Sequence, residues 1–357
     1  MHHSNPHILP IATLSSNISR FDAIIDVRSP AEFALDHIPG AINLPVLSNQ
    51  ERIEIGTLYK QVSPFAAKKL GAAYVSRNIA RHLEESLIDF SREWRPLIYC
   101  WRGGERSGAF THILNRIGWK AMQLEQGYQG FRRLVIDDLD KAARLFQFQV
   151  ICGMTGSGKT RVLRELNNLG AQVLDLEGLA IHRGSVLGNE PNHEQPSQKA
   201  FETSIWNALS LLNPEKIVYV ESESKKVGGL HIPDALMESI RHGQCIELRS
   251  STITRVSWLL REYAHFVSDP ENFKTKLALL TSRYGKIQIA KWCEAIDSSE
   301  FASLVEELLV MHYDPSYQSS IARNFPKYRE ENFVLLQSDS DDAFAQAAKD
   351  IITRVGA

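Results

Sequence analysis

Cysteines, long apolar runs and an excess charge of either sign are scarce in this sequence of 357 residues. Its four cysteines are widely separated and form no CxxC pair, which argues against a disulfide framework or a cysteine-ligated metal and favours a reducing compartment. No apolar run approaches the length of a membrane span, and the N-terminal MHHSNPH lacks the basic stretch and apolar core of a signal peptide. We therefore expect a soluble, cytoplasmic protein with no membrane partner.

The charge is nearly balanced. The 40 basic and 42 acidic side chains give a formal net charge of -2, so the whole chain has no electrostatic attraction to nucleic acid. Any RNA binding would need local basic patches. The hydrophobic share of 43% and charged share of 23% are ordinary for a globular chain, and the length predicts two or three domains.

Short apolar segments alternate with helical stretches, which predicts an α/β fold with parallel, doubly wound sheets. A boundary near residue 146 would separate a first domain, 1–146, from a second, 147–357, with a helical block at about 252–312. Helices are also expected over most of 51–94 and over 131–145. The expected strands cover 22–27, 41–44, 97–100, 121–124, 148–152, 173–176, 217–221, 245–248 and 333–336.

Local signals predict where some elements begin and end. Ser29 and Glu32 flank Pro30 in the pattern of a capping box, which predicts a helix start. Gly118 is expected to end a helix that Ser107 opens. Residues 127–130 (GYQG) are predicted to form a turn.

Residues 153–160 (GMTGSGKT) match the phosphate-binding pattern GxxxxGK[ST] in full, after an apolar strand and before a helical segment. Glycines let the backbone N–H groups point at phosphate oxygens, and the helix N-terminus adds a favourable dipole. Lys159 supplies a cation and Thr160 can hold Mg²⁺. The predicted phosphate-binding residues are Gly153, Thr155, Gly156, Ser157, Gly158, Lys159 and Thr160.

The acidic partner of this loop is less defined by the sequence. Asp175 and Glu221 each stand at the end of an apolar segment and are candidates for metal binding or acid/base chemistry, with Glu223 nearby. No NKxD-type motif for reading a base is present in the sequence. The loop therefore indicates a diphosphate or triphosphate ligand, and ATP is only one candidate.

The segment 100–107 (CWRGGERS) connects an apolar strand to a helix. Backbone N–H groups, the helix N-terminus and two arginines favour a thiolate at Cys100, which could accept sulfur or selenium. The other three cysteines are interpreted as small buried hydrophobes. The segment also fits the C-x5-R pattern of cysteine phosphatases, the less favoured alternative because Tyr99 replaces the usual preceding histidine. The active-loop candidates are Cys100, Arg102, Gly103, Gly104, Arg106 and Ser107.

The order of the motifs is itself informative. DVRSPAEFALDHIPGAINLP resembles the rhodanese signature, and YCWRGGERSG resembles its active loop, one residue longer than in many simple rhodaneses. GMTGSGKT, DLEGLAIHRGSVLG and VYVESESKKVG follow. Over nearly its whole length the chain resembles the tRNA 2-selenouridine synthase family. The resemblance implies a transferase that S-geranylates wobble 2-thiouridine with geranyl diphosphate and then exchanges the geranylthio group for selenium from selenophosphate.

The resemblance also implies roles for residues and partners. Cys100 would carry selenium as S-selanylcysteine, with Arg102 and Arg106 steadying selenophosphate. Lys159 and Thr160 would hold geranyl diphosphate, with Mg²⁺ as a further candidate cofactor. The implied partners are tRNAs of the Lys, Glu and Gln type and the selenophosphate-producing enzyme.

Contacts to RNA are the least defined part of the site. His182, Arg183, Lys225 and Lys226 are candidates for RNA or diphosphate contacts, and the run 182–185 that ends at Ser185 could line the diphosphate pocket. Further basic residues that could contact RNA are Lys68, Lys69, Arg77, Arg81 and Arg255. A single basic residue is more often part of a solvated helix face.

Two other functions compete with this interpretation. One is a P-loop kinase or nucleotidyl-transferase fused to a rhodanese-type sulfur carrier. The other is a binding module without chemistry, which the intact Cys100 and Lys159 disfavour.

Overall fold

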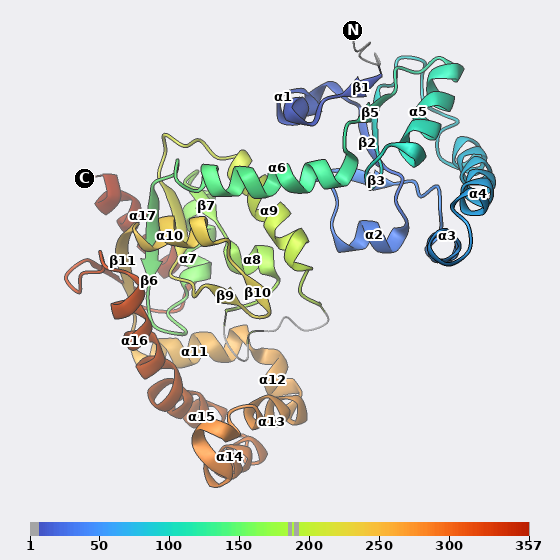
Figure 1. Cartoon of the computed structure of the whole chain (residues 1–357). Helices are drawn as coiled ribbons and strands as arrows, with labels where there is room; N and C mark the ends of the chain where they lie inside the picture. Colours follow the sequence, from blue (N-terminus) through green and yellow to red (C-terminus); the bar gives the residue numbers. More distant parts are fainter. Residues whose placement is uncertain (1–6, 185–187, 189–192, 357) are drawn as a thin grey trace. The chain divides into compact units, whose positions relative to one another are not determined.

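The computed structural model describes residues 7–184, 188 and 193–356, and the chain forms two compact units (Figure 1). The first contains Met1–Asp138 and Ser197–Asn207; the second contains Leu139–Pro196 and Ala208–Ala357. This division differs from a single cut at residue 146, because most of helix α9 (Gln198–Ser210) belongs to the first unit. There Thr203 Oγ1 donates to Asp36 at 3.0 Å and Trp206 Nε1 donates to Asp138 at 3.1 Å.

The first unit is built on a five-stranded sheet in the order β1-β5-β4-β2-β3, and every described pairing in it is parallel. Four strands fall on expected segments, and the two-residue β1 is additional. The central strands β4 and β2 are almost wholly buried. The strands are β1 (Ile8–Leu9), β2 (Ala23–Asp26), β3 (Ala41–Asn43), β4 (Pro96–Tyr99) and β5 (Met122–Leu124).

Helices of the first unit begin and end largely where the local signals predict. Ser29 and Glu32 form the expected capping box, and Gly118 ends a helix in the left-handed conformation. The turn predicted at 127–130 is wrong, because these residues are the first turn of α6. The helices are α1 (Leu14–Asn17), α2 (Pro30–Leu35), α3 (Asn49–Gln61), α4 (Pro64–Glu85), α5 (Glu105–Ile117) and α6 (Gly127–Ala142), with short 3-10 turns at Ile11–Thr13 and Ile18–Arg20.

The second unit has another five-stranded parallel sheet, in the order β12-β11-β6-β8-β7. All five strands overlap expected segments, and β6 (Phe148–Cys152) matches its expected bounds. A small antiparallel pair, β9 (Lys226–Val227) with β10 (Leu230–His231), is additional. The other strands are β7 (Gln172–Leu174), β8 (Val218–Glu221), β11 (Gln244–Arg249) and β12 (Phe333–Leu335).

Apolar side chains from two helices cover this second sheet. Val162 and Leu166 of α7 (Lys159–Asn168) and Phe344 of α17 (Asp341–Gly356) share one buried cluster with Ile151 and Ile246 of the sheet. Two shorter helices are α8 (Leu176–Ala180) and α10 (Asp234–Arg241). Because β6 lies in the middle of the sheet, the loop that follows it is anchored on both sides by buried strands.

A helical block follows β11 and has a core of its own, which includes Phe266, Leu277, Trp292 and Leu304. The block extends beyond the expected end at residue 312, because α16 continues directly from a short π-helix, η3. None of the helices in the described part of the chain has the length and apolar character needed to cross a bilayer. The block comprises α11 (Thr252–Glu262), α12 (Ala264–Ser268), α13 (Pro270–Ala278), α14 (Thr281–Asp297), α15 (Phe301–Leu308), η3 (Leu309–Tyr313) and α16 (Asp314–Asn324).

Candidate functional site

Cys100 lies where β4 ends and the loop to α5 begins, as the sequence predicts. Its side chain is only 2% exposed. The Ser107 hydroxyl, in the first turn of α5, donates to Cys100 Sγ at 3.3 Å. The thiol is also 3.7 Å from the Arg102 carbonyl oxygen. The loop therefore holds a single cysteine sulfur between a hydroxyl donor at a helix N-terminus and a backbone carbonyl acceptor.

The first turn of α6 supports the cysteine loop. The N–H groups of Tyr128 and Gln129 donate to the carbonyl oxygens of Cys100 and Trp101 at 2.8 and 3.0 Å. These bonds satisfy donors that a helix start leaves free, which explains why a helix begins where the sequence suggested a turn. Gly127 is required there: its φ is +51°, and a Cβ would lie 2.3 Å from the Cys100 carbonyl oxygen.

The two predicted anion-binding arginines differ in their surroundings. Arg102 is exposed. Arg106 donates to Glu32 at 3.1 Å, and Arg52 lies 3.6 Å from the same carboxylate. Burial of Glu32 would raise its pKa, but the arginines outweigh this effect and keep the pKa below its ordinary value. An anion bound by Arg106 would therefore compete with Glu32.

A buried ion pair next to the loop was not singled out from the sequence. The side chains of Asp26 and Arg28 are 0% and 1% exposed, and Arg28 Nη2 lies 2.6 Å from Asp26 Oδ2. Arg28 also donates to the Asp36 carbonyl at 2.6 Å and stands 3.9 Å from the centre of the Tyr128 ring. The pair thereby joins β2, α2 and α6. Its sequence signal is the DVR of the rhodanese-like segment.

The P-loop of the second unit borders a polar cavity of about 550 Å³. Gly158, the residue before α7, has a φ of +80°, and a Cβ there would lie 2.4 Å from the Phe344 ring. Lys159 Nζ donates across the loop to the Gly153 carbonyl at 2.9 Å. Among the predicted phosphate-binding residues, Thr155, Gly156, Gly158, Lys159 and Thr160 line the cavity.

Three carboxylates gather on the wall of this cavity. Ligand oxygens of Glu177, Glu221 and Glu223 all lie within 4.8 Å of one another. Thr160 Oγ1 donates to Glu177 at 3.0 Å. Burial and the neighbouring carboxylates raise the pKa of Glu177 and Glu221 to about 8, and burial and Glu221 raise that of Glu223 to about 7. Glu221 Oε1 is buried and has no hydrogen-bond partner among the described residues.

This donor set fits a hard divalent cation such as Mg²⁺, which prefers oxygen ligands and would offset the mutual repulsion of the carboxylates. The sequence singled out Glu221 and noted Glu223, but it gave Asp175 in place of Glu177. Asp175 also lines the cavity, where its carboxylate accepts from the Gly178 N–H at 2.8 Å and caps α8. The signal for Glu177 was its place two residues after Asp175 in DLEG.

Side chains of the helical block hold the P-loop from the other side. Arg255 of α11 donates to the Thr155 carbonyl at 2.8 Å and pairs with Asp314 at 2.5 Å. The Gly153 N–H donates to the Tyr317 hydroxyl at 2.6 Å. The prediction that Arg255 contacts RNA is wrong, because this side chain is only 4% exposed and already paired.

The remaining basic candidates are dispersed. His182 and Arg183 line the polar cavity, where Arg183 donates to the Glu262 carbonyl at 2.5 Å, whereas Ser185 lies outside the described residues. Lys225 pairs with Asp234 at 2.6 Å, and Lys226 is exposed on β9. On α4, Lys68 and Lys69 are exposed, while Arg77 pairs with Glu51 at 2.7 Å and Arg81 lies 4.0 Å from Glu85. RNA contacts at these positions stay predictions.

Two known domain families match this chain, one in each unit. The rhodanese-like domain family matches residues 11–134, and the tRNA 2-selenouridine synthase AAA domain family matches residues 146–283. Fold and sites thus define a rhodanese-like domain, with its cysteine loop, joined to an AAA-type P-loop domain.

Individual relatives make the assignment specific. The chain is 32% identical to the tRNA 2-selenouridine synthase of Alcanivorax borkumensis over 84% of this chain and 90% of that protein. The synthase of a Sulfurovum species is also 32% identical, over 84% and 89%. The chain belongs to the tRNA 2-selenouridine synthase family. The synthase of Nitrosomonas europaea is 37% identical over 67% of this chain, and that match spans 63% of the relative's length, less than two thirds.

Proposed function

We propose that this protein is a transferase that converts wobble 2-thiouridine of tRNA to 2-selenouridine by S-geranylation followed by selenation. Its family membership supports the tRNA substrate. The observation that carries the proposal is the presence, in one chain, of a cysteine loop and of a phosphate cavity with Lys159 and three carboxylates. The first suits a nucleophile, and the second suits an anionic leaving group.

In the first step, the sulfur of 2-thiouridine attacks C1 of geranyl diphosphate. A C–S bond forms, the C1–O bond breaks, diphosphate leaves with the electron pair, and the base loses its N–H proton. Lys159 and the backbone N–H groups of the P-loop would hold the diphosphate and stabilise its developing charge. Thr160, Glu177 and Glu221 would hold a divalent cation, which supplies further neutralisation of that charge. The alkylated C2 is more electrophilic, and geranylthiolate is a better leaving group than sulfide.

In the second step, Cys100 is the nucleophile toward selenophosphate. Attack at selenium gives the S-selanylcysteine that the family resemblance implies; it releases phosphite and later needs two electrons to free the selenouridine. Attack at phosphorus gives S-phosphocysteine and hydrogen selenide, which displaces geranylthiolate at C2; water then returns the thiol and phosphate without any redox partner. The C-x5-R spacing and the contact from Ser107 to the sulfur suit the second route. Mass spectrometry of the Cys100 peptide distinguishes the two routes: a selenium isotope pattern on the peptide indicates the first, and a phosphorus label on it indicates the second.

Nucleoside mass spectrometry of thiolated tRNA incubated with both donors tests the proposal. Cys100→Ala should still produce geranylated uridine but no selenouridine, because the prenyl step uses the other unit. Lys159→Ala should lose geranylation, and selenouridine with it. Cys293→Ala, a half-buried cysteine of the helical block, and Lys349→Ala, an exposed lysine of α17, are the matched controls. Normal selenation by Cys100→Ala, or full-rate geranylation by Lys159→Ala, would contradict these assignments.

A kinase or nucleotidyl-transferase is the second candidate, because carboxylates beside the P-loop Thr160 also suit a metal-bound nucleotide. This function predicts ATP or GTP turnover with neither tRNA nor prenyl donor. Nucleotide hydrolysis assays with Mg²⁺ on wild type and Lys159→Ala decide between the two. Turnover that Lys159→Ala abolishes, without any geranylated product, would favour the kinase.

A further inference from the structure

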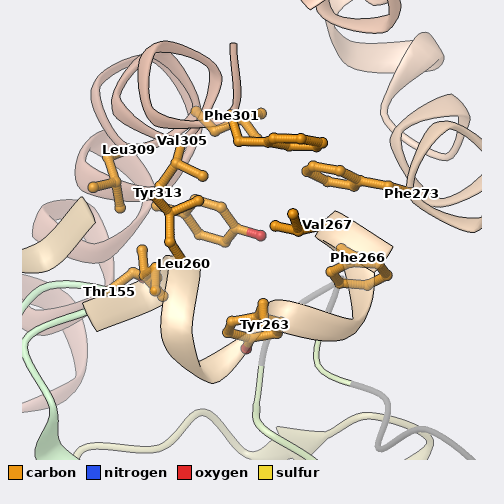
Figure 2. A pocket seen from close by; sticks show the side chains of 12 residues that line it. Thr155, Leu260, Tyr263, Phe266, Val267, Phe273, Phe301, Val305, Leu309 and Tyr313 are labelled. Carbon is orange, nitrogen blue, oxygen red and sulfur yellow. The ribbon is translucent and has the colours of Figure 1, made fainter. Parts of the chain in front are cut away.

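A second, apolar cavity lies inside the helical block next to the P-loop (Figure 2). Its volume is about 60 Å³, and its walls come from α11, α12, α13, α15 and the π-helix η3. Phe273, Phe301 and Val305 stand on the side away from the P-loop, and Tyr313 points its ring between them and Thr155 (Figure 2). The two tyrosine hydroxyls and Thr155 are the polar side-chain groups of this wall.

The apolar cavity shares part of its wall with the phosphate site. Thr155, Leu259, Tyr263 and Tyr313 line both this cavity and the polar cavity around Lys159. A single ligand that fills both must therefore have an anionic head and a hydrocarbon tail. A nucleotide base would meet phenylalanine, leucine and valine here, with few partners for its hydrogen-bonding edge, and burying unpaired polar groups is unfavourable.

We infer that the apolar cavity binds the far end of the hydrocarbon chain of an allylic diphosphate, and that Phe301 and Val305 set the chain length accepted. This inference rests on the prenyl transfer of the proposed function and adds a tail site to it. The volume of about 60 Å³ corresponds to roughly five water-sized groups at about 10–15 Å³ each. That is the number of carbons in one isoprene unit, so the distal unit of a geranyl chain fits. The proximal unit then lies along Leu259 and Tyr263, on the shared wall.

The π-helix is a second observation at the same place. Such helices are rare and occur frequently at functional sites, because the extra residue per turn redirects side chains. Here η3 ends at Tyr313, which both cavities share. A regular α-helix over these residues would place the tyrosine ring differently and alter the wall that the two cavities share.

A competition experiment tests the tail site. The full chain is incubated with thiolated tRNA and equal amounts of dimethylallyl, geranyl and farnesyl diphosphates, and mass spectrometry gives the ratio of S-alkylated products. Each buried carbon is worth about fourfold, so the five extra carbons of the geranyl chain predict a preference over dimethylallyl on the order of 1000-fold. Val305→Trp should lower that ratio by about tenfold or more, because the indole fills the cavity. Phe301→Ala should raise the farnesyl-to-geranyl ratio by about tenfold.

Two controls keep the outcomes distinct. Val310→Trp introduces the same side chain at a position that is 58% exposed and does not line the cavity, and its ratios should equal those of wild type. Inhibition by inorganic pyrophosphate should be unchanged in every variant, which shows an intact fold and head site. If Val305→Trp loses pyrophosphate binding, Phe301→Ala alone decides.

The results that overturn the inference are also distinct. One such result is that wild type prenylates tRNA but the product ratios of Val305→Trp and Phe301→Ala stay within about twofold of the wild-type ratios. This would refute the tail site and leave the proposed function standing. No prenylated product from wild type with any donor would refute both. A loss of ATP binding in Val305→Trp, with prenyl donors unaffected, would assign the cavity to a nucleotide base.

Discussion

Replacing Glu221 by glutamine should stabilise the metal-free protein at high pH. Glu221 is 4% exposed, and burial with the nearby Glu177 raises its pKa to about 8. The pKa of an unfolded glutamate is about 4.3. Because the folded state holds the proton more tightly, the stability that this group contributes is fully present below about pH 4 and is lost as the pH rises through about 8. Wild type should therefore unfold more easily at about pH 9 than at about pH 5.

The size of the effect follows from the shift. A change of three to four pKa units corresponds to about 4–5 kcal/mol at about 1.36 kcal/mol per unit. The three carboxylates share their protons, so one replacement should recover only part of this free energy of unfolding. We expect a gain of about 2 kcal/mol at about pH 9 and almost none at about pH 5. Urea unfolding with EDTA at both pH values measures the difference.

Excess Mg²⁺ provides the second arm of this experiment. The cation should stabilise wild type most at high pH, where the carboxylates are ionised, and should stabilise Glu221→Gln less, since one ligand charge is gone. Glu238→Gln on the exposed face of α10 is the matched control and should follow wild type throughout. The reasoning fails if metal-free wild type is equally stable at both pH values, or if Glu221→Gln keeps the wild-type dependence on pH.

Two further predictions concern stability. Gly158→Ala should lower the stability of the fold by about 1–3 kcal/mol and weaken diphosphate binding, because its Cβ would lie 2.4 Å from the Phe344 ring. Gly170 has a similar φ of +83° but open space around it, so Gly170→Ala should lose less stability. Equal losses for the two variants in calorimetric melting would contradict the role of the clash. Asp26→Asn should destabilise the first unit by about 3–5 kcal/mol, because it leaves Arg28 buried without its carboxylate. If urea unfolding shows a loss below about 1 kcal/mol, this role of the ion pair is refuted.

Elements determined by neighbouring residues could be predicted from the sequence. The strand Phe148–Cys152 and the capping box at Ser29 are examples, because an apolar run and a local side-chain bond specify them. The helix start at Gly127 could not be predicted, since its free N–H groups are satisfied by carbonyls of the distant Cys100 loop. A sequence pattern reflects local preference, and here hydrogen bonds between loops at the ends of the neighbouring strands β4 and β5 override it.

The candidate sites show the same limit. Cys100 and the P-loop are contiguous motifs, and the structure places them at strand ends as expected. The carboxylate cluster is not contiguous: Glu177 follows β7 and Glu221 ends β8, and the pairing of these two strands brings them together. The apolar cavity depends on four helices and a π-helix packing together, so no single segment carries a signal for it.

Arg255 bonds to the Thr155 carbonyl and pairs with Asp314, and these two contacts affect how a ligand dissociates. Arg255 joins the P-loop to the residue that directly follows η3, and η3 carries Tyr313 on the wall of both cavities. Head and tail of a donor would then bind cooperatively, and such coupling is reciprocal. After transfer, the tail stays with the product and the diphosphate loses that cooperative partner. We expect the spent diphosphate to dissociate faster than the intact donor.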